Sequence, residues 1–503
     1  MKVLLGPQPP VGGARSPQDV AVGIRATDSS AEYGCTGAHP DHFFFFFFFF
    51  FFFFFCFVVD TVRLVGATSS VRSVRAPPKS LGTTSIQSDG VGMTHASVVS
   101  RGARWFLLLG ACFLVAGATA ALLDAPRATV VGFGLFGFVF HTVFGKGYSL
   151  VPAYFDRQLA SARAPLVHLP LAAVGTVGIA LGPFVDSTAG FAALAPLGTA
   201  LWSLGALVFL STVGWTVRDN VTGAETGTAE SKAERARVDR LANATMPFAL
   251  GFLAIGAVEA VAVAAGGWSI TGSRFAVTHL LAVGTATLLV FGIGARLLPR
   301  LLRASAPPWL VALVLSTGTI APALLVGWFA GVGGQWSVLL LAAAVGSLSL
   351  ALVGHAVVVG LLCHRAPAPR LGAYGVLAGA VFGVLTAALG AAVAFGWWPS
   401  ILAVHPRLGL FGFLGATILG VTYHFYPPAV AGRYGDPLAR VALVLVVGGL
   451  LFELVVHATA VAVLTAGVPS VAAVERLGQS LVVGGAVAHV AVLALVFHAR
   501  ATR

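Results

Sequence analysis

Charged residues are scarce in this chain. Only 10% of its 503 residues are Asp, Glu, Lys or Arg, whereas 57% are hydrophobic, and the mean hydropathy is +0.92. Soluble domains carry about 25% charged residues, so this chain has too little polar surface to cover a particle in water. The composition excludes an ordinary soluble globular protein and indicates an integral membrane protein.

Cysteine is also scarce. The four cysteines, Cys35, Cys56, Cys112 and Cys363, form no CxxC pair and have no regular spacing, which argues against a disulfide framework and a thiolate metal site. The chain has no P-loop, GxSxG, HExxH or CxxCH motif. Phosphate hydrolysis, triad hydrolysis, zincin proteolysis and c-type haem attachment are therefore without support.

The formal charge of +12 does not indicate nucleic-acid binding. Arginine and lysine lie in short gaps between apolar runs, as topology signals do, and are not gathered into a patch that would bind phosphate. The partner that this pattern predicts is the lipid bilayer, with no nucleic acid.

Residues 1–92 differ from the rest of the chain. They are rich in Ser, Gly, Pro and Arg, and they contain a run of thirteen phenylalanines, Phe43–Phe55. No signal-peptide layout surrounds the run. We interpret 1–92 as a low-complexity, disordered extension, and Met93 as an alternative start of the chain.

Apolar runs long enough to cross a bilayer alternate with short polar gaps from Trp105 onward. The sequence thus predicts an all-α integral membrane protein in which residues 93–503 form a domain of about twelve transmembrane helices. The predicted spans are 105–123, 130–152, 165–184, 191–215, 246–265, 275–298, 309–331, 336–362, 372–395, 403–425, 439–465 and 473–498.

Basic residues orient these spans. One side of the membrane receives only four of the loop arginines, Arg127, Arg274, Arg407 and Arg476, and the other loop arginines fall on the opposite side. By the positive-inside rule both termini are cytoplasmic. The expected location is the cytoplasmic membrane of a prokaryote.

A three-residue pattern occurs in spans 2, 6 and 10. A glycine is followed eight residues later by a second glycine and seven residues after that by a proline. The three sets are Gly137, Gly145 and Pro152; Gly284, Gly292 and Pro299; and Gly412, Gly420 and Pro427. Their spacing of four spans predicts three pseudo-equivalent four-helix units, with small residues that allow close helix packing in lipid.

Twelve helices built as three four-helix units, with both termini inside, resemble subunit I of the haem-copper oxidases. The segment His405–Pro428 (HPRLGLFGFLGATILGVTYHFYPP) is similar to the tenth helix of divergent members. The resemblance covers roughly residues 101–500. It implies haem, copper or another metal as cofactor, electron transfer in a respiratory chain, and other respiratory membrane subunits as partners.

The chain departs from that family at the copper site. His405 is followed by Pro406 and Arg407 in place of a second histidine, Val283 stands where the family has a tyrosine, and Pro307–Gly331 lacks a histidine pair. We therefore do not expect a dinuclear oxygen-reducing centre. If the chain is an enzyme, the resemblance implies an oxidoreductase with a reduced site.

Ionisable groups within spans are the candidate site residues. Aligning the repeats places His279 and His405 level to within about 3 Å near the outer face, so these two are candidate haem ligands. His457, with Glu453 one turn away, is a candidate metal ligand pair at a similar level. His141, near the middle of span 2, is a third candidate haem ligand, where the family has one.

Three alternatives stay open at this point. The chain also resembles the haem- and copper-containing membrane family of the nitric-oxide response, which is of similar size. A transporter or channel without cofactor would use Glu259, Glu453 and Lys146 to line its path. A structural membrane subunit on the same fold is the third.

Overall fold

The computed structural model describes residues 95–185, 193–397, 399–464 and 471–502. The chain divides into two units, Met1–Gln87 and Ser88–Arg503, and the description below concerns the second. The predicted extension 1–92, with its phenylalanine run and Met93, lies outside the described residues.

Within the described ranges all regular elements are helices, and twelve of them are long and apolar enough to cross a membrane. The predicted twelve spans are confirmed. Nine are continuous α-helices: α3 (His95–Leu122), α6 (Ala164–Val185), α7 (Leu194–Val217), α8 (Ala236–Ala264), α11 (Pro308–Phe329), α12 (Ser337–Arg365), α13 (Leu371–Ala394), α16 (Gly435–Leu464) and α17 (Val471–Ala501). They form spans 1, 3, 4, 5, 7, 8, 9, 11 and 12.

The structure differs from the prediction at several helix ends. Helix α8 begins at Ala236, well before the predicted start at residue 246, and α3 begins at His95 where residue 105 was predicted. Hydropathy marks only the apolar part of a helix, whereas the backbone hydrogen bonds continue through polar residues beyond it. Part of the predicted long loop 218–245 is therefore helical.

Spans 2, 6 and 10 are each interrupted by a π-helical segment. Span 2 comprises α4 (Arg127–Val131), η1 (Gly132–Val139) and α5 (Phe140–Tyr154); span 6 comprises α9 (Arg274–His279), η4 (Leu280–Thr287) and α10 (Leu288–Leu301); span 10 comprises α14 (Val404–Arg407), η7 (Leu408–Ala416) and α15 (Thr417–Phe425). Each π-helical segment contains the first glycine of the pattern. Such segments are rare and are frequent at functional sites.

These first glycines are needed for close packing. A Cβ atom added to any of them would lie 2.7 Å from a phenylalanine side chain of the preceding span, which is too close for two carbon atoms. The pairs are Gly137 with Phe113, Gly284 with Phe252, and Gly412 with Phe382. The sequence pattern therefore records a steric requirement between neighbouring helices.

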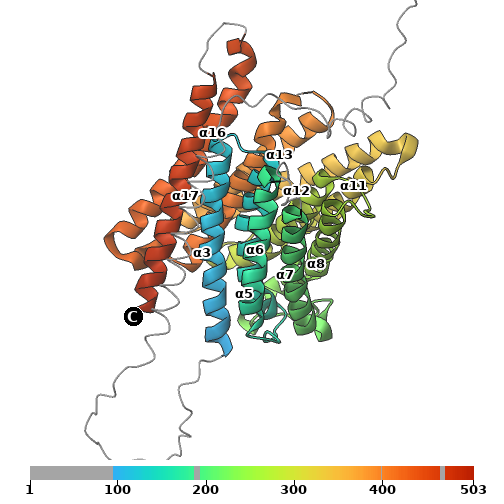
Figure 1. The fold of residues 1–503 in the computed structure, drawn as a ribbon. Helices are drawn as coiled ribbons and strands as arrows, with labels where there is room; N and C mark the ends of the chain where they lie inside the picture. Colours follow the sequence, from blue (N-terminus) through green and yellow to red (C-terminus); the bar gives the residue numbers. More distant parts are fainter. Residues whose placement is uncertain (1–94, 186–192, 398, 465–470, 503) are drawn as a thin grey trace, which may run out of the picture. The chain divides into compact units, whose positions relative to one another are not determined.

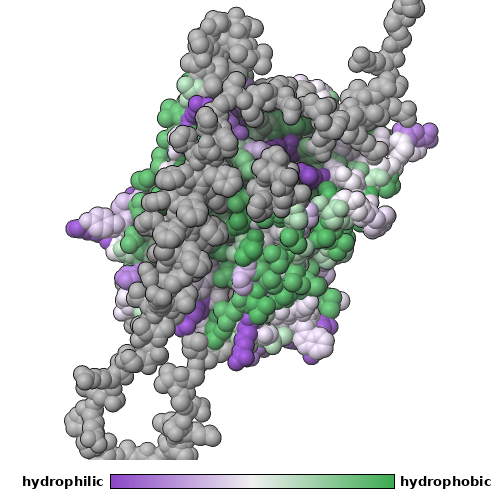
Figure 2. All heavy atoms as spheres, in the orientation of Figure 1, coloured by the Kyte–Doolittle hydropathy of each residue, from purple (hydrophilic) through white to green (hydrophobic). Residues whose placement is uncertain are grey.

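Spans 2, 6 and 10 meet inside the bundle. Segment η1 contacts both η4 and η7, and spans 2 and 10 are the most buried of the twelve. The first span, α3, lies beside the last, α17 (Figure 1). On the face drawn in Figure 2, hydrophobic side chains occupy the middle of the described helices and hydrophilic ones lie mainly near their ends, as expected for helices in lipid.

Short 3-10 turns complete the connections. They are η2 (Arg218–Asn220), η3 (Glu230–Arg235), η5 (Gly334–Trp336), η6 (Pro399–Ala403) and η8 (Pro428–Tyr434).

Candidate functional site

The structure brings the predicted residues His279 and His405 together. His279 is the last residue of α9, directly before η4, and His405 lies in α14, just before η7. The centroids of the two imidazole rings are 6.5 Å apart and the ring planes differ by 20°. The equal depth predicted from the repeat thus corresponds to a pair of neighbouring side chains.

The surroundings of the two rings leave nitrogen lone pairs available. Nδ1 of His279 donates a hydrogen bond to the carbonyl of Phe275 at 2.7 Å, which leaves Nε2 as an unprotonated acceptor. In His405, the buried Nδ1 has no hydrogen-bond partner, and the ring also lies at the backbone carbonyl of Thr386. This ring packs directly on Gly390, where a Cβ atom would lie 3.0 Å from His405 Cε1.

The spacing of the pair fits two ligands of one metal. Imidazole nitrogens bind metals at about 2.0–2.1 Å, so two rings on opposite sides of one ion have centroids roughly 6 Å apart. The hydrogen bond from His279 to a backbone carbonyl is the arrangement that orients histidine ligands. Across the described residues no group of three or more His, Cys, Asp or Glu is placed to hold a metal.

Arg127, at the start of span 2, lies near this pair. Its guanidinium is 4.3 Å from the ring centroid of Phe275 and is close enough to act electrostatically on both His279 and His405. Spans 2, 6 and 10 therefore each contribute a polar residue at this end of the bundle, which we call the histidine end.

His141, the third predicted haem ligand, lies elsewhere. It is fully buried, its ring lies 5.7 Å from the Phe106 ring and 5.0 Å from the Phe113 ring, and its Nδ1 donates to the carbonyl of Gly137 at 2.7 Å. Its Nε2 is buried without a partner. His141 is thus a potential ligand, but in a different place from the His279–His405 pair.

The π-helical segment beside His141 has a visible consequence for hydrogen bonding. The carbonyl of Phe136 accepts hydrogen bonds from Thr176 of α6 and Trp202 of α7, each at 3.2 Å. Nδ1 of His141 also lies 3.2 Å from this oxygen. The wider turn therefore exposes a carbonyl that two neighbouring helices bind.

Glu453 and His457, predicted as a metal pair, belong to an ion-pair cluster. The nearly unexposed Glu453 places Oε2 3.0 Å from Nε of Arg407, and Nη2 of Arg407 is 2.8 Å from Oε1 of Glu475. His457 Nε2 lies 3.7 Å from the same Glu475 oxygen, which also accepts from Gln479. Arg407 thus pairs with both glutamates, and the predicted metal site at Glu453 and His457 stays a prediction.

A second buried ionic cluster lies at the opposite end of span 6, and the sequence did not reveal it. Asp239 of α8 pairs with Arg296 at 3.5 Å and with Arg300 at 2.5 Å, and accepts a hydrogen bond from Thr228. Arg296 also donates to Asn243 at 2.5 Å. We call this the arginine end; the acid and its cations are separated by 57 or more residues, so only folding places them together.

Two buried tyrosine–histidine pairs were also not predicted. The hydroxyl of Tyr148 lies 3.0 Å from Nδ1 of His168, and that of Tyr423 lies 3.1 Å from Nδ1 of His489. The two tyrosines occupy corresponding positions of spans 2 and 10. The sequence showed only that the two tyrosines correspond. Their histidine partners could not be found in the repeat, because they lie in other helices, α6 and α17.

Glu259, which the transporter alternative places along its path, fixes a loop. Its carboxylate accepts hydrogen bonds from the backbone amides of Ile270 and Thr271, at 2.9 and 2.7 Å, and from the Thr271 hydroxyl at 2.6 Å. These bonds satisfy the carboxylate locally, between α8 and α9.

No protein-family model matches the chain, and no curated protein matches it.

Proposed function

We propose that the chain is a membrane redox protein in which His279 and His405 bind one transition metal, either a haem iron or a copper ion. The observation that carries this proposal is the 6.5 Å separation of the two rings. It is supported by the hydrogen bond that leaves Nε2 of His279 free and by the unpartnered Nδ1 of His405.

The proposed architecture is that of haem-copper oxidase subunit I: three pseudo-equivalent four-helix units around spans 2, 6 and 10, with both termini cytoplasmic. Three features support it. The π-helical segments recur at the first glycine of each pattern, each of these glycines packs on a phenylalanine of the preceding span, and the three spans meet through η1, η4 and η7.

The protein residues set what the site does. When bound, the metal supplies one-electron transfer. His279 and His405 hold it between spans 6 and 10, and the Arg127 guanidinium at the same end favours an anionic group nearby. His279 and His405 would be the metal's protein ligands, and because the chain lacks the further histidines of a dinuclear centre, we favour electron transfer within a prokaryotic respiratory membrane over oxygen reduction.

The test is an absorbance spectrum and a metal analysis of the full chain, purified from a host supplied with haem and copper. We expect a haem Soret band or stoichiometric copper in the wild type, lost or shifted in His279→Ala and in His405→Ala. His364→Ala is the matched control, because His364 is an exposed histidine at the end of α12. It should leave the spectrum and the metal content unchanged.

Two results would contradict the proposal: wild-type protein without colour or metal, or a spectrum unaffected by both substitutions. His141→Leu tests the remaining predicted haem ligand. A change in that variant with the His279–His405 signal intact assigns His141 to a second centre.

A further inference from the structure

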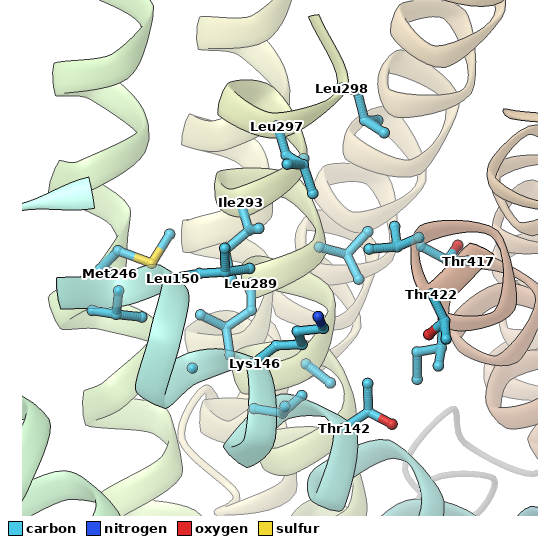
Figure 3. Close-up of a pocket in the computed structure, with 18 of the residues that line it drawn as sticks. Thr142, Lys146, Leu150, Met246, Leu289, Ile293, Leu297, Leu298, Thr417 and Thr422 are labelled. Carbon is cyan, nitrogen blue, oxygen red and sulfur yellow. The ribbon is translucent and has the colours of Figure 1, made fainter. Parts of the chain in front are cut away.

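A cavity of about 110 Å³ lies among spans 2, 6 and 10. Its walls are mostly aliphatic, and side chains from α7, α8, α12 and α13 complete them. Figure 3 shows Leu289, Ile293 and Leu297 on one side of the space and Thr417 and Thr422 on the other. On span 10, Thr417 follows His405 by twelve residues, which places the cavity about 18 Å from the histidine pair.

Lys146 is the one charged residue among those that line the cavity. Its amine extends into the space (Figure 3) and lies 3.8 Å from the ring centroid of Phe425 and 4.4 Å from that of Tyr426. Over the described part of the chain, none of the ion pairs involves Lys146. The ammonium thus faces the cavity with two aromatic rings beside it, the Arg500 guanidinium nearby and no carboxylate.

Two further polar atoms in the cavity wall are buried without partners. Thr417 is 5% exposed and its Oγ1 makes no hydrogen bond; His355 is 4% exposed and its Nε2 makes none. A buried hydroxyl or ring nitrogen left without a partner costs about 1–3 kcal/mol. Oγ1 of Thr417 lies against Gly379 of α13, whereas the His355 ring faces Gly294 in the cavity wall, so a ligand with oxygen atoms could bind Nε2 of His355.

We propose that this cavity binds a small organic anion, a short-chain carboxylate, whose oxygens pair with Lys146 and whose alkyl chain lies against the aliphatic wall. Size supports this class, because an apolar cavity of about 150 Å³ holds benzene, with six non-hydrogen atoms. By proportion the present cavity holds about four or five, as in propionate. The aliphatic wall disfavours strongly hydrated inorganic anions, which would lose their water.

The experiment is a calorimetric titration of propionate into the full chain in phosphatidylcholine nanodiscs, which contain no anionic lipid. Propionamide, which has the same size and no charge, is the ligand control. We expect saturable propionate binding, at least tenfold weaker propionamide binding, and at least tenfold weaker propionate binding by Lys146→Met. Lys232→Met is the matched control, because Lys232 is exposed, and should bind as the wild type does.

Gly294→Leu blocks the cavity without touching Lys146. The nearest atoms to an added Cβ at Gly294 are Leu298 Cδ1 at 3.7 Å and His355 Cε1 at 4.0 Å, so the variant has room to fold while its side chain fills the space. It should lose propionate binding and keep the elution profile of the wild type in size-exclusion chromatography.

The proposal is overturned if the wild type binds no propionate, if propionamide binds equally well, or if Lys146→Met binds propionate as the wild type does. Repeating the titration in nanodiscs with phosphatidylglycerol distinguishes two sources of the anion. Weaker apparent binding there means that a lipid headgroup competes for Lys146, whereas unchanged binding means that the site takes a free carboxylate. A haem or copper signal plays no part in these measurements, so they stand apart from the test of the redox function.

Discussion

Replacing Arg407 by glutamine removes the cation that joins spans 10, 11 and 12. Arg407 is 9% exposed, and it is within ion-pair distance of both Glu453, at 3.0 Å, and Glu475, at 2.8 Å. Glu453 is 1% exposed, so the substitution leaves a carboxylate in an apolar surrounding with no counter-ion.

Removing one partner of a buried ion pair costs about 3–5 kcal/mol. The exchange Glu453→Gln is milder, because Arg407 keeps its contact with Glu475. We expect it to lower the free energy of unfolding by about 1–2 kcal/mol, the size of a lost charged hydrogen bond. In the double variant no charge is stranded at residue 453. Its loss should therefore be smaller than the sum of the single losses by about 2–3 kcal/mol.

The assay is the fraction of protein that remains monodisperse in size-exclusion chromatography after heating. The quantity compared is the temperature at which half of the protein remains monodisperse. At about 2 °C per kcal/mol for a large domain, Arg407→Gln should lower this midpoint temperature by roughly 6–10 °C. The control is Arg476→Gln, whose ion pair with Asp124 is 3.4 Å long and well exposed, so the midpoint should hardly change. Strictly additive losses in the double variant, or equal effects of both arginine substitutions, would refute this reasoning.

Three other substitutions test the helix packing, the second ionic cluster and the loop that Glu259 holds. Gly412→Ala should destabilise the protein by about 1–3 kcal/mol through overpacking against a phenylalanine ring, whereas Gly448→Ala, in open space on a helix, should be neutral or stabilising in the same heating assay. Asp239→Asn should cost about 3–5 kcal/mol, since it leaves two arginines without their acid, and the exposed Asp219→Asn should cost little. Glu259→Gln should weaken the loop between α8 and α9, which limited proteolysis would detect as faster cleavage there.

The number of spans could be predicted because bilayer thickness fixes how long an apolar helix must be. The equal depth of His279 and His405 could be predicted because aligned positions on helices with a rise of about 1.5 Å per residue lie at equal depths; that the two rings are neighbours comes from the structure. Both predictions need only distances along a single helix axis. The three four-helix units, the cytoplasmic termini and the cofactor stay predictions.

The ionic clusters could not be predicted for a different reason. Arg407 lies in the predicted tenth span beside His405, and nothing in its local sequence indicates that Glu453 and Glu475 approach it from two other helices. The π-helical segments were also not predicted, because hydropathy does not register a change of hydrogen-bond partner by one residue. The sequence pattern did, however, contain one glycine that lies in each π-helical segment.

The two ionic clusters explain how this bundle tolerates buried charge. His279 and Arg300 lie at opposite ends of span 6, and 21 residues of helix between them correspond to about 32 Å, close to the thickness of the hydrocarbon layer. The two clusters therefore lie towards the two ends of the bundle, where each buried acid is paired with arginine inside the protein. At the histidine end, Arg407 pairs with two glutamates, and at the arginine end two arginines pair with one aspartate. Between them, the half-buried Lys146 has two aromatic rings and the Arg500 guanidinium near it and no acid as an ion-pair partner, so the proposed carboxylate would supply the missing negative charge.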